Sequence, residues 1–301
     1  MLSPDPMPFK TNRLPGALPR LSGCSMLGFA GAEAGAFLQA QTMNDVRALA
    51  VGQWHWNGWL NPKGRVIALF ALLRLGEDDY IAVLPDYPAS ELLPLLQRFV
   101  FRAKVRLQVV TGLVACADLE PPTDEGLARD VAQGDAESGV RLDFSSQTVR
   151  RHLWLLPESD ELVGQSKADT DSEWLRQDLA HGLPRLAQDQ REAWTPQMLS
   201  LDRLHAFSLK KGCYPGQEIV ARTHYLGQAR RGLRRVLGQG LAEGASLANE
   251  QAEPLGSIIC ATADAREGLA VVQLDRVSPG ALAGDRPVAL PDFLEGLQRP
   301  V

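Results

Sequence analysis

A cysteine lies between charged residues in the segment Lys211 to Glu218, whose sequence is KGCYPGQE. Two lysines precede Cys213, and Pro215 followed by polar and acidic residues is typical of the start of a helix. Positive neighbours and a helix N-terminus both stabilise a thiolate, so this setting predicts a reactive thiol. A structural interpretation stays open, because the carboxylate of Glu218 opposes that effect and a lone cysteine before a helix is often a small buried side chain.

Positive charge continues beyond this segment. From position 222 to position 235 the chain has no acidic residue but five arginines, Arg222, Arg230, Arg231, Arg234 and Arg235. Guanidinium groups suit the geometry of carboxylates and phosphates alike, so the segment is a candidate for binding a polyglutamyl tail, an RNA backbone or the acidic surface of a partner protein. A solvated linker that leads into the last domain explains the same pattern equally well.

The composition of the 301 residues limits the classes of protein to consider. A hydrophobic content of 45% supports a sizeable core divided among two or three domains, and a net charge of −5 argues against a general polyanion binder. The longest apolar run, Val66 to Leu73, has only eight residues, and the first ten residues lack the apolar core of a targeting signal. A cytoplasmic location is therefore expected.

The four cysteines are far apart in the sequence, at positions 24, 116, 213 and 260, and no histidine stands at ligand spacing from them. Neither a zinc site nor a cluster-binding site is therefore encoded locally, and no residue is assigned as a metal ligand. A disulfide framework is not expected in a chain of this length without a secretion signal, so the pattern predicts free thiols.

Hydrophobic periodicity and turn signals predict an α+β pattern. The expected helices and strands of the first third are helices at 33–43 and 90–101 and strands at 65–75, 80–84 and 105–110. A later helix near Trp174 is expected to end at His181-Gly182, where the glycine and the following Pro184 stop it. Short apolar runs beyond Val236, separated by turn signals, suggest a small β-barrel.

Three tryptophans, Trp54, Trp56 and Trp59, surround Asn57-Gly58. The Asn-Gly pair between apolar residues predicts the crest of a hairpin. The tryptophans are candidates for the lining of a ligand cavity, and equally for the core, because indole rings bury a large area wherever they fall.

Two groups of motifs carry a resemblance to a known family. The first consists of Trp194 to Met198, Leu201-Asp202, Phe207 and the run KGCYPGQEIVAR from Lys211 to Arg222. The second consists of Phe37 to Gln41, Asn44 to Val46 and Leu60 to Arg65. With these motifs the chain resembles the YgfZ family, which are folate-binding proteins related to the T-protein of the glycine cleavage system and linked to the maturation or repair of iron–sulfur enzymes. The resemblance covers most of the chain and is weakest between about residues 112 and 190.

The resemblance implies an α+β fold with a T-protein-like arrangement of three domains, in which two interleaved α/β lobes precede a small C-terminal β-barrel. The implied divisions are a first part of the folate-binding region at 1–110, a second part with the cysteine motif at 111–228, and the barrel at 229–301.

The resemblance also implies a folate-binding accessory protein that supports iron–sulfur cluster assembly or repair in client enzymes, including tRNA-modifying enzymes. Its cofactor is expected to be tetrahydrofolate or a one-carbon derivative, and its partners to be client or assembly proteins, with tRNA or an acidic partner at the arginine segment. Cys213 is the residue on which the function of the family depends most. The residues expected to bind the cofactor are Lys211, Tyr214, Gln217, Glu218 and Arg222 from the motif and, less directly, Asn44, Asp45, Lys63, Gly64 and Arg65.

One part of the T-protein pattern is missing. Where that enzyme has paired aspartates, one of them essential to aminomethyl transfer, this chain has Ala68 and Leu69. A methyl group cannot orient an amine or relay a proton, so aminomethyltransferase chemistry is expected to be absent. Two alternatives stay open: a tetrahydrofolate-dependent one-carbon transferase that uses a different base, and a tRNA-binding module that acts through Arg222 to Arg235.

Overall fold

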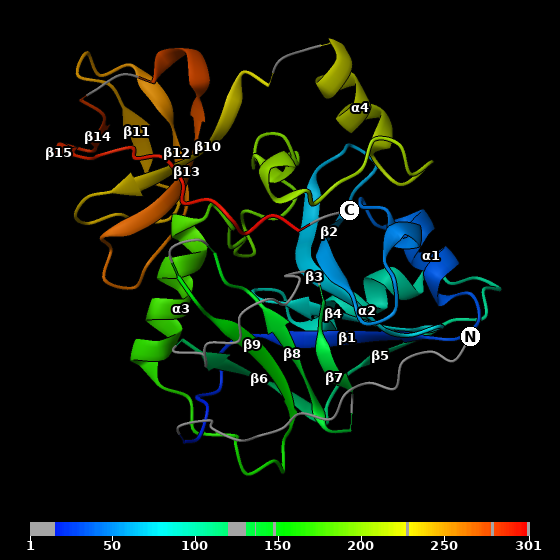
Figure 1. The fold of residues 1–301 in the computed structure, drawn as a ribbon. Coiled ribbons are helices and arrows are strands. Elements are labelled where there is room, and N and C mark those ends of the chain that lie inside the picture. Colours follow the sequence, from blue (N-terminus) through cyan, green and yellow to red (C-terminus); the bar gives the residue numbers. More distant parts are fainter. Residues whose placement is uncertain are drawn as a thin grey trace.

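The computed structural model describes residues 16–119, 131–135, 137–146, 149–226, 229–277 and 280–299. Within them the chain forms three antiparallel sheets and a small number of helices, as the α+β prediction required (Figure 1). No helix among these residues has the length and apolar character needed to cross a membrane.

The first sheet has five strands in the order β2-β3-β4-β1-β5. Their bounds are Trp54–Leu60 (β2), Val66–Gly76 (β3), Asp79–Leu84 (β4), Ser25–Ala30 (β1) and Arg106–Val109 (β5). Helices α1 (Ala34–Gln41) and α2 (Ala89–Gln97) cover one face, and a short 3₁₀ helix, Val46–Ala48, follows α1. These elements confirm the helices and strands predicted for this part of the chain, because the long apolar runs are buried on both faces of the sheet.

The predicted hairpin crest at Asn57-Gly58 is wrong. Residues 54–60 form one continuous buried strand, β2, which pairs with β3 along its whole length. The side-chain oxygen of Asn57 accepts hydrogen bonds from the backbone N–H groups of Asn44 (2.9 Å) and Gly58 (2.8 Å). A buried polar side chain that has hydrogen-bond partners is tolerated in the middle of a strand, so the Asn-Gly pair does not turn the chain here.

The second sheet has the order β6-β9-β8-β7 and faces the side of the first sheet that the helices leave uncovered. Its strands are Leu113–Asp118 (β6), His152–Pro157 (β9), Gly139–Asp143 (β8) and Gln133–Asp135 (β7). Helix α3 (Ala168–Ala180) packs beside it and is capped by His181, and Gly182 follows with a φ of +70°, which confirms the predicted C-terminal stop.

After α3 the chain returns to the first sheet. The backbone N–H of Val66 donates to the carbonyl of Trp194 (2.8 Å), and that of Ser208 donates to the carbonyl of Met43 (2.9 Å). This returning segment contains a 3₁₀ helix, Leu201–Leu204, and ends in helix α4, Gln217–Leu226. Segments far apart in the sequence therefore share one core.

The third sheet has six strands in the order β10-β13-β12-β11-β14-β15. Their bounds are Arg231–Leu237 (β10), Glu267–Gln273 (β13), Pro254–Ala261 (β12), Ser246–Ala248 (β11), Leu282–Ala283 (β14) and Arg286–Pro287 (β15), with a 3₁₀ helix at Leu274–Arg276. Within the described ranges β10 and β15 are not paired as strands, so the expected barrel is seen as a curled sheet; one bridge joins Leu237 to Ala289.

The C-terminal segment crosses back from the third sheet to the middle of the molecule, as the red trace in Figure 1 shows. The indole N–H of Trp56 donates to the carbonyl of Leu297 (2.8 Å), and the backbone N–H of Leu294 donates to the carbonyl of Ala180 (2.9 Å). Leu297 is buried in the same cluster as β2, β9 and α3. The segment therefore ties the three sheets together.

Candidate functional site

Cys213 lies on an exposed loop directly before helix α4. It is the exposed member of the four cysteines, all of which are free. Burial raises the pKa of Cys24 and Cys260 to about 12 and that of Cys116 to about 11, so these three stay protonated thiols at neutral pH. Cys213 is therefore the thiol that a reagent or a partner protein can reach.

The loop that carries Cys213 is held against the N-terminal block by two glycines. Gly216 has a φ of +78° and Gly64 a φ of +68°, a region that favours glycine. A β-carbon on Gly216 would lie 2.6 Å from the carbonyl oxygen of Asn61, and one on Gly64 would lie 2.9 Å from the β-carbon of Ile219. The two motifs on which the sequence prediction rested are thus in contact.

The side chain of Lys211 turns into the protein. Its ammonium group donates a hydrogen bond to the backbone carbonyl of Thr42 and lies 5.0 Å from the centre of the Tyr214 ring. Burial lowers the pKa of Lys211 to about 7, although Asp45 opposes this shift. Near pH 7 the lysine that the sequence places beside Cys213 is therefore partly neutral and faces the N-terminal block.

Asn44 and Asp45 lie under the same loop. The side-chain amide of Asn44 donates to the carbonyls of Trp56 (2.8 Å) and His205 (2.7 Å), and its oxygen accepts from the backbone N–H of Asp45 (2.9 Å). The carboxylate of Asp45 accepts from the backbone N–H of Arg47 (3.1 Å) and so caps a 3₁₀ helix. These contacts fix the backbone on which the Cys213 loop rests.

The turn before β3 is organised by Asn61. Its side-chain oxygen accepts from the backbone N–H groups of Lys63 (2.9 Å) and Arg65 (3.0 Å). The guanidinium of Arg65 donates to the carbonyl of Ala193 (2.6 Å), and Lys63 is exposed. The structure thus brings Lys63, Gly64 and Arg65 next to the start of α4.

The other motif residues belong to the loop and to α4. The hydroxyl of Tyr214 donates to the carbonyl of Ser208 (3.4 Å), and burial raises the Tyr214 pKa to about 12. The backbone N–H of Gln217 donates to the carbonyl of Tyr214 (3.1 Å). Glu218 and Arg222 are exposed on α4. The predicted residues therefore form one continuous region around the start of α4, and their role in binding a cofactor stays a prediction.

The arginine segment divides into two parts. Arg222, Arg230 and Arg231 are exposed, whereas Arg234 and Arg235 are partly buried. Arg235 forms an ion pair with Glu267 (2.6 Å), a residue of the neighbouring strand β13. Three of the five arginines thus present their charge to solvent.

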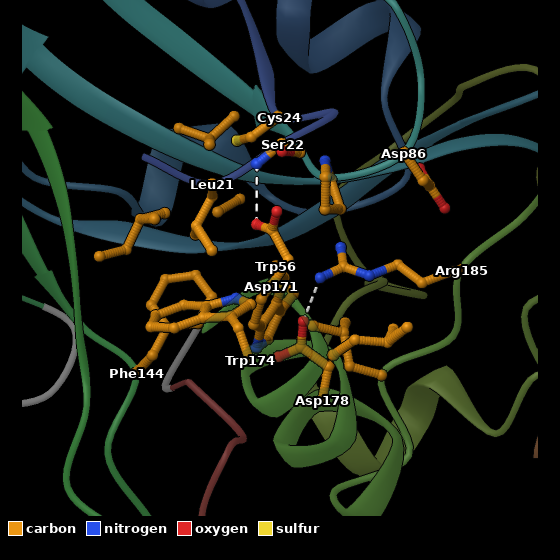
Figure 2. Close-up of a pocket in the computed structure, with 16 residues that line it drawn as sticks. Leu21, Ser22, Cys24, Trp56, Asp86, Phe144, Asp171, Trp174, Asp178 and Arg185 are labelled. Atoms are coloured by element: carbon orange, nitrogen blue, oxygen red, sulfur yellow. Dashed lines mark hydrogen bonds and ion pairs between the residues drawn. The ribbon is translucent and has the colours of Figure 1, made fainter. Parts of the chain in front are cut away.

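A cavity of about 250 Å³ lies elsewhere, between the first two sheets and α3 (Figure 2). Its aromatic walls are Trp56, Phe144 and Trp174, and its charged groups are three aspartates and one arginine. The residues that line it are Leu21, Ser22, Cys24, Trp56, Ala71, Val83, Pro85, Asp86, Phe144, Leu153, Asp171, Trp174, Leu175, Asp178, Leu183 and Arg185. None of the site residues predicted from the sequence is among them.

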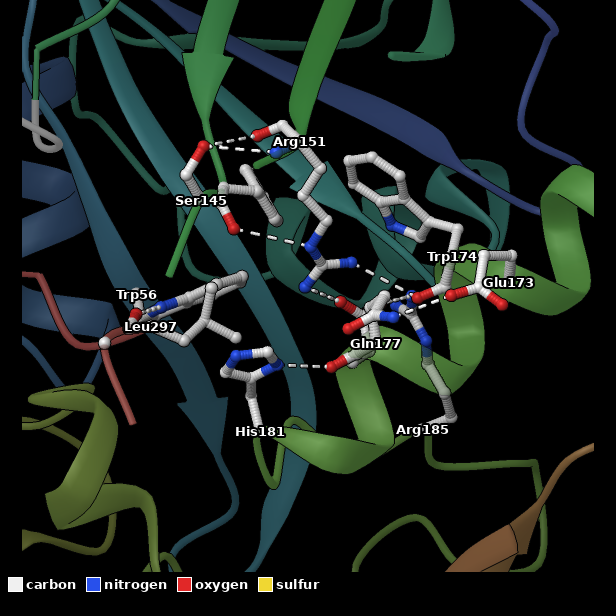
Figure 3. A network of polar contacts seen from close by, with 12 residues as sticks. Trp56, Ser145, Arg151, Glu173, Trp174, Gln177, His181, Arg185 and Leu297 are labelled. Carbon is white, nitrogen blue, oxygen red and sulfur yellow. Dashed lines mark hydrogen bonds and ion pairs between the residues drawn. The ribbon is translucent and has the colours of Figure 1, made fainter. Parts of the chain in front are cut away.

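The walls of the cavity are held by a buried arginine (Figure 3). The guanidinium of Arg151 lies 4.5 Å from the centre of the Trp174 ring and 5.7 Å from that of Phe144, and it donates to the backbone carbonyls of both residues. It also pairs with the carboxylate of Asp178 at 2.6 Å, and both side chains are fully buried. Breaking a buried pair of this kind is strongly destabilising, so Arg151 fixes the shape of the cavity.

One part of this cavity was predictable from the sequence, and the rest was not. Trp56 lines it, as one of the two interpretations of the tryptophans suggested, whereas Trp54 stacks on Phe144 at 4.9 Å in the core. The missed signal lies on α3, where Asp171, Trp174 and Asp178 follow the i, i+3, i+7 spacing of one helix face. An aromatic and acidic face on a helix is unusual for a core-facing surface and marks a candidate site.

The positions of the missing aspartates lie on β3. Ala68 and Leu69 are 2% and 1% exposed and belong to the apolar packing of the first sheet. Neither position supplies a carboxylate.

Comparison with known proteins defines the class first. The fold is that of a glycine cleavage system aminomethyltransferase T. The crystal structure of the aminomethyltransferase T from Bartonella henselae matches this chain with a TM-score of 0.73 and 17% sequence identity, over 94% of this chain and 87% of the other chain. No family model matches the sequence.

Sequence relatives narrow the class. The chain is 27% identical to the tRNA-modifying protein YgfZ of Edwardsiella ictaluri, over 77% of this chain and 73% of the relative. It is 26% identical to the proteins of the same name from Vibrio vulnificus, over 74% of this chain and 70% of the relative, and from Escherichia coli, over 76% and 74%. These relatives confirm the resemblance drawn from the motifs: the chain is similar in sequence to YgfZ proteins, and its fold is T-protein-like.

Proposed function

We propose that this protein binds tetrahydrofolate or a one-carbon derivative in the cavity between the first two sheets, and not at the residues around the start of α4 that the motif suggested. We further propose that Cys213, outside that cavity, supports iron–sulfur enzymes that modify tRNA. The observation that carries the folate half is the cavity itself, which is apolar, walled by three aromatic rings and supplied with a few converging charged groups. The names of the relatives, tRNA-modifying proteins, support the second half.

The residues present fit a reduced folate. Trp56, Phe144 and Trp174 offer aromatic surfaces to a flat heterocycle, and the carboxylates and guanidinium offer both acceptors and donors to its polar edge. The volume is slightly below the usual range of ligand pockets, which suits a ring system with the remainder of the ligand extending outward. Bound tetrahydrofolate supplies a carrier for one-carbon units.

Aminomethyl transfer is not part of this proposal, because Ala68 and Leu69 provide no carboxylate at the two positions where that enzyme has aspartates. Cys213 is instead proposed to react with, or coordinate transiently, a group that a partner protein brings to it. Its exposure, together with the exposed Arg222, Arg230 and Arg231, supports contact with a client protein, an assembly protein or tRNA.

The test separates the two halves. Calorimetric titration with tetrahydrofolate under anaerobic reducing conditions is expected to show saturable binding of equal affinity to the wild type and to Cys213→Ser. In cells that lack the protein, the wild type should restore the iron–sulfur-dependent nucleosides of tRNA, and Cys213→Ser should not. Cys116→Ala is the control, because it removes a buried thiol instead of the exposed one.

Each result bears on one half of the proposal. No binding of tetrahydrofolate by either protein would remove the folate site. Full restoration of the modified nucleosides by Cys213→Ser, at equal protein level, would remove the thiol role and leave the folate site standing.

A further inference from the structure

Arg185 is the basic side chain that lines the cavity, and it does so among acids. The lining includes Asp86, Asp171 and Asp178. Figure 2 shows the guanidinium of Arg185 reaching from the rim toward the other lining side chains, with Asp178 on one side of it. Its Nη2 donates to Asp178 Oδ2, and the other oxygen of that carboxylate forms an ion pair with the buried Arg151 at 2.6 Å.

The guanidinium is therefore held at one end and free at the other. Among the residues that the structure describes, Nη1 of Arg185 has no hydrogen-bond partner, although the atom is buried. A buried donor without an acceptor is costly, roughly 1–3 kcal/mol for an ordinary group and more for a charged one. The cost falls if a ligand in the cavity brings an acceptor oxygen.

The charges around Arg185 decide which end of a folate could bring an acceptor oxygen to its guanidinium. Three aspartates face two arginines here, Arg185 in the lining and Arg151 behind Asp178, so the remaining negative charge disfavours the carboxylates of a glutamate tail. A neutral lactam fits better, because it presents a carbonyl oxygen next to a ring N–H. Asp178 has acceptor capacity left for that N–H, since a carboxylate offers about four lone-pair sites and two arginines occupy only part of them.

We infer that Arg185 is the residue that recognises the ring carbonyl of the pterin, with Asp178 accepting the adjacent ring N–H and with the glutamate tail outside the cavity. This inference rests on the proposed function. Arg151 is a positioning residue in it, because it reaches the ligand only through Asp178 and through the aromatic walls that it holds.

The test uses two ligands that differ at the atom in question. Folic acid carries an oxygen at ring position 4, and its 4-amino-4-deoxy analogue carries an amino group there, which turns an acceptor into a donor. Arg185→Gln is expected to weaken folic acid by about 10- to 100-fold, the range of a lost charge-assisted hydrogen bond, and to change binding of the amino analogue by less than about 3-fold. Tetrahydrofolate, titrated anaerobically, should lose affinity as folic acid does.

Arg20→Gln is the matched control, because Arg20 also pairs with a carboxylate, Glu158 at 3.0 Å, but lines no part of the cavity. A pterin without a tail, 6-methyltetrahydropterin, separates the two ends of the ligand. It should be weakened by Arg185→Gln as much as tetrahydrofolate is.

Three results would overturn the inference. Equal losses for folic acid and its amino analogue would mean that Arg185 acts on the shape of the cavity and not on the ring oxygen. A loss confined to ligands with a glutamate tail would place Arg185 at the tail. If the wild type bound none of these ligands, the proposed function would fall and the inference with it, whereas folate binding that Arg185→Gln leaves unchanged would remove the inference alone.

Discussion

The cavity and the Cys213 loop are built on opposite principles. The cavity lies between two sheets and a helix, and the charged series Arg151, Asp178 and Arg185 holds its aromatic walls in place. The Cys213 loop is exposed at its reactive atom and is held by its backbone, through Gly216 and Gly64. A site of the first kind selects a small molecule by shape, and a site of the second kind presents a side chain to a larger partner.

This difference suggests how the two could work in one protein. No residue of the Cys213 loop lines the cavity, so a ligand there does not need the thiol in order to bind. The two regions are still joined through β2, because Trp56 lines the cavity while its carbonyl accepts from Asn44, which lies under the loop. Separate sites on a shared strand allow ligand binding to be tested without touching the thiol, and the reverse.

The largest effect that would separate the cavity from the Cys213 loop is expected from a variant that fills the cavity. Ala71 lies on β3 and contributes a small side chain to the lining. Ala71→Phe is expected to place a ring in the ligand space and to weaken tetrahydrofolate by about 100-fold or more, measured by calorimetry, because a filled pocket excludes a flat heterocycle. The rate at which a thiol reagent labels Cys213 should be unchanged.

A second variant guards against simple misfolding. Leu175 lines the same cavity from the half-buried side of α3, so Leu175→Trp fills it with less demand on the core. Parallel loss of folate binding and of normal Cys213 labelling in both variants, at unchanged thermal stability, would show that the two regions are one site.

The sequence predicted well where the signal is local and apolar. The 11-residue strand β3 and the helices α1 and α2 follow from hydrophobic period alone, since burial on both faces of the first sheet needs near-continuous apolar runs. The family motif likewise brought together two loops that the structure places in contact, near Gly64 and Gly216.

The sequence failed where long-range contacts decide. Asn57 stays inside a strand because a backbone N–H from Asn44 reaches its side chain, and Lys211 turns inward because Thr42 and Tyr214 receive it. The cavity draws its lining from β2, β3, β4, β9, α3 and the loops between them, and no local motif marks such a set. Only the face of α3 with Trp174 and Asp178 carried a readable sign of it.

A single added β-carbon at Gly216 is expected to break the contact between the Cys213 loop and the turn at Asn61. Gly216 and Gly212 both have positive φ, +78° and +93°, but a β-carbon would clash at Gly216 and not at Gly212, where no atom of the described residues lies within 4 Å of it. Gly212→Ala is expected to lower the free energy of unfolding by about 1–2 kcal/mol through backbone strain. Gly216→Ala should lower it by about 3 kcal/mol or more, because overpacking is added.

Urea unfolding measures both losses, and limited proteolysis reports whether the loop has detached. Folate affinity should be the same in the two variants, because neither glycine lines the cavity. Equal losses of stability would mean that the loop is not held by the close approach of Gly216 to Asn61.

The smallest expected effect concerns the buried amine under the loop. The folded-state pKa of Lys211, about 7, lies below its ordinary value of 10.5. Between these values the unfolded chain binds a proton that the folded chain does not, so the stability of the wild type rises with pH through this window. The cost of charging the buried amine is fully present below pH 7 and is relieved above it.

Lys211→Met removes this titration, so the rise in unfolding free energy of about 1 kcal/mol per pH unit between pH 8 and 9 should disappear relative to the wild type. Lys210→Met is the matched control, since it removes the exposed neighbouring lysine and keeps the buried amine of Lys211. The measurement is urea unfolding at a series of pH values. Parallel stability profiles for the wild type and Lys211→Met would mean that the amine stays charged inside the protein, and that Lys211 supplies the Cys213 loop with the positive charge that the sequence suggested.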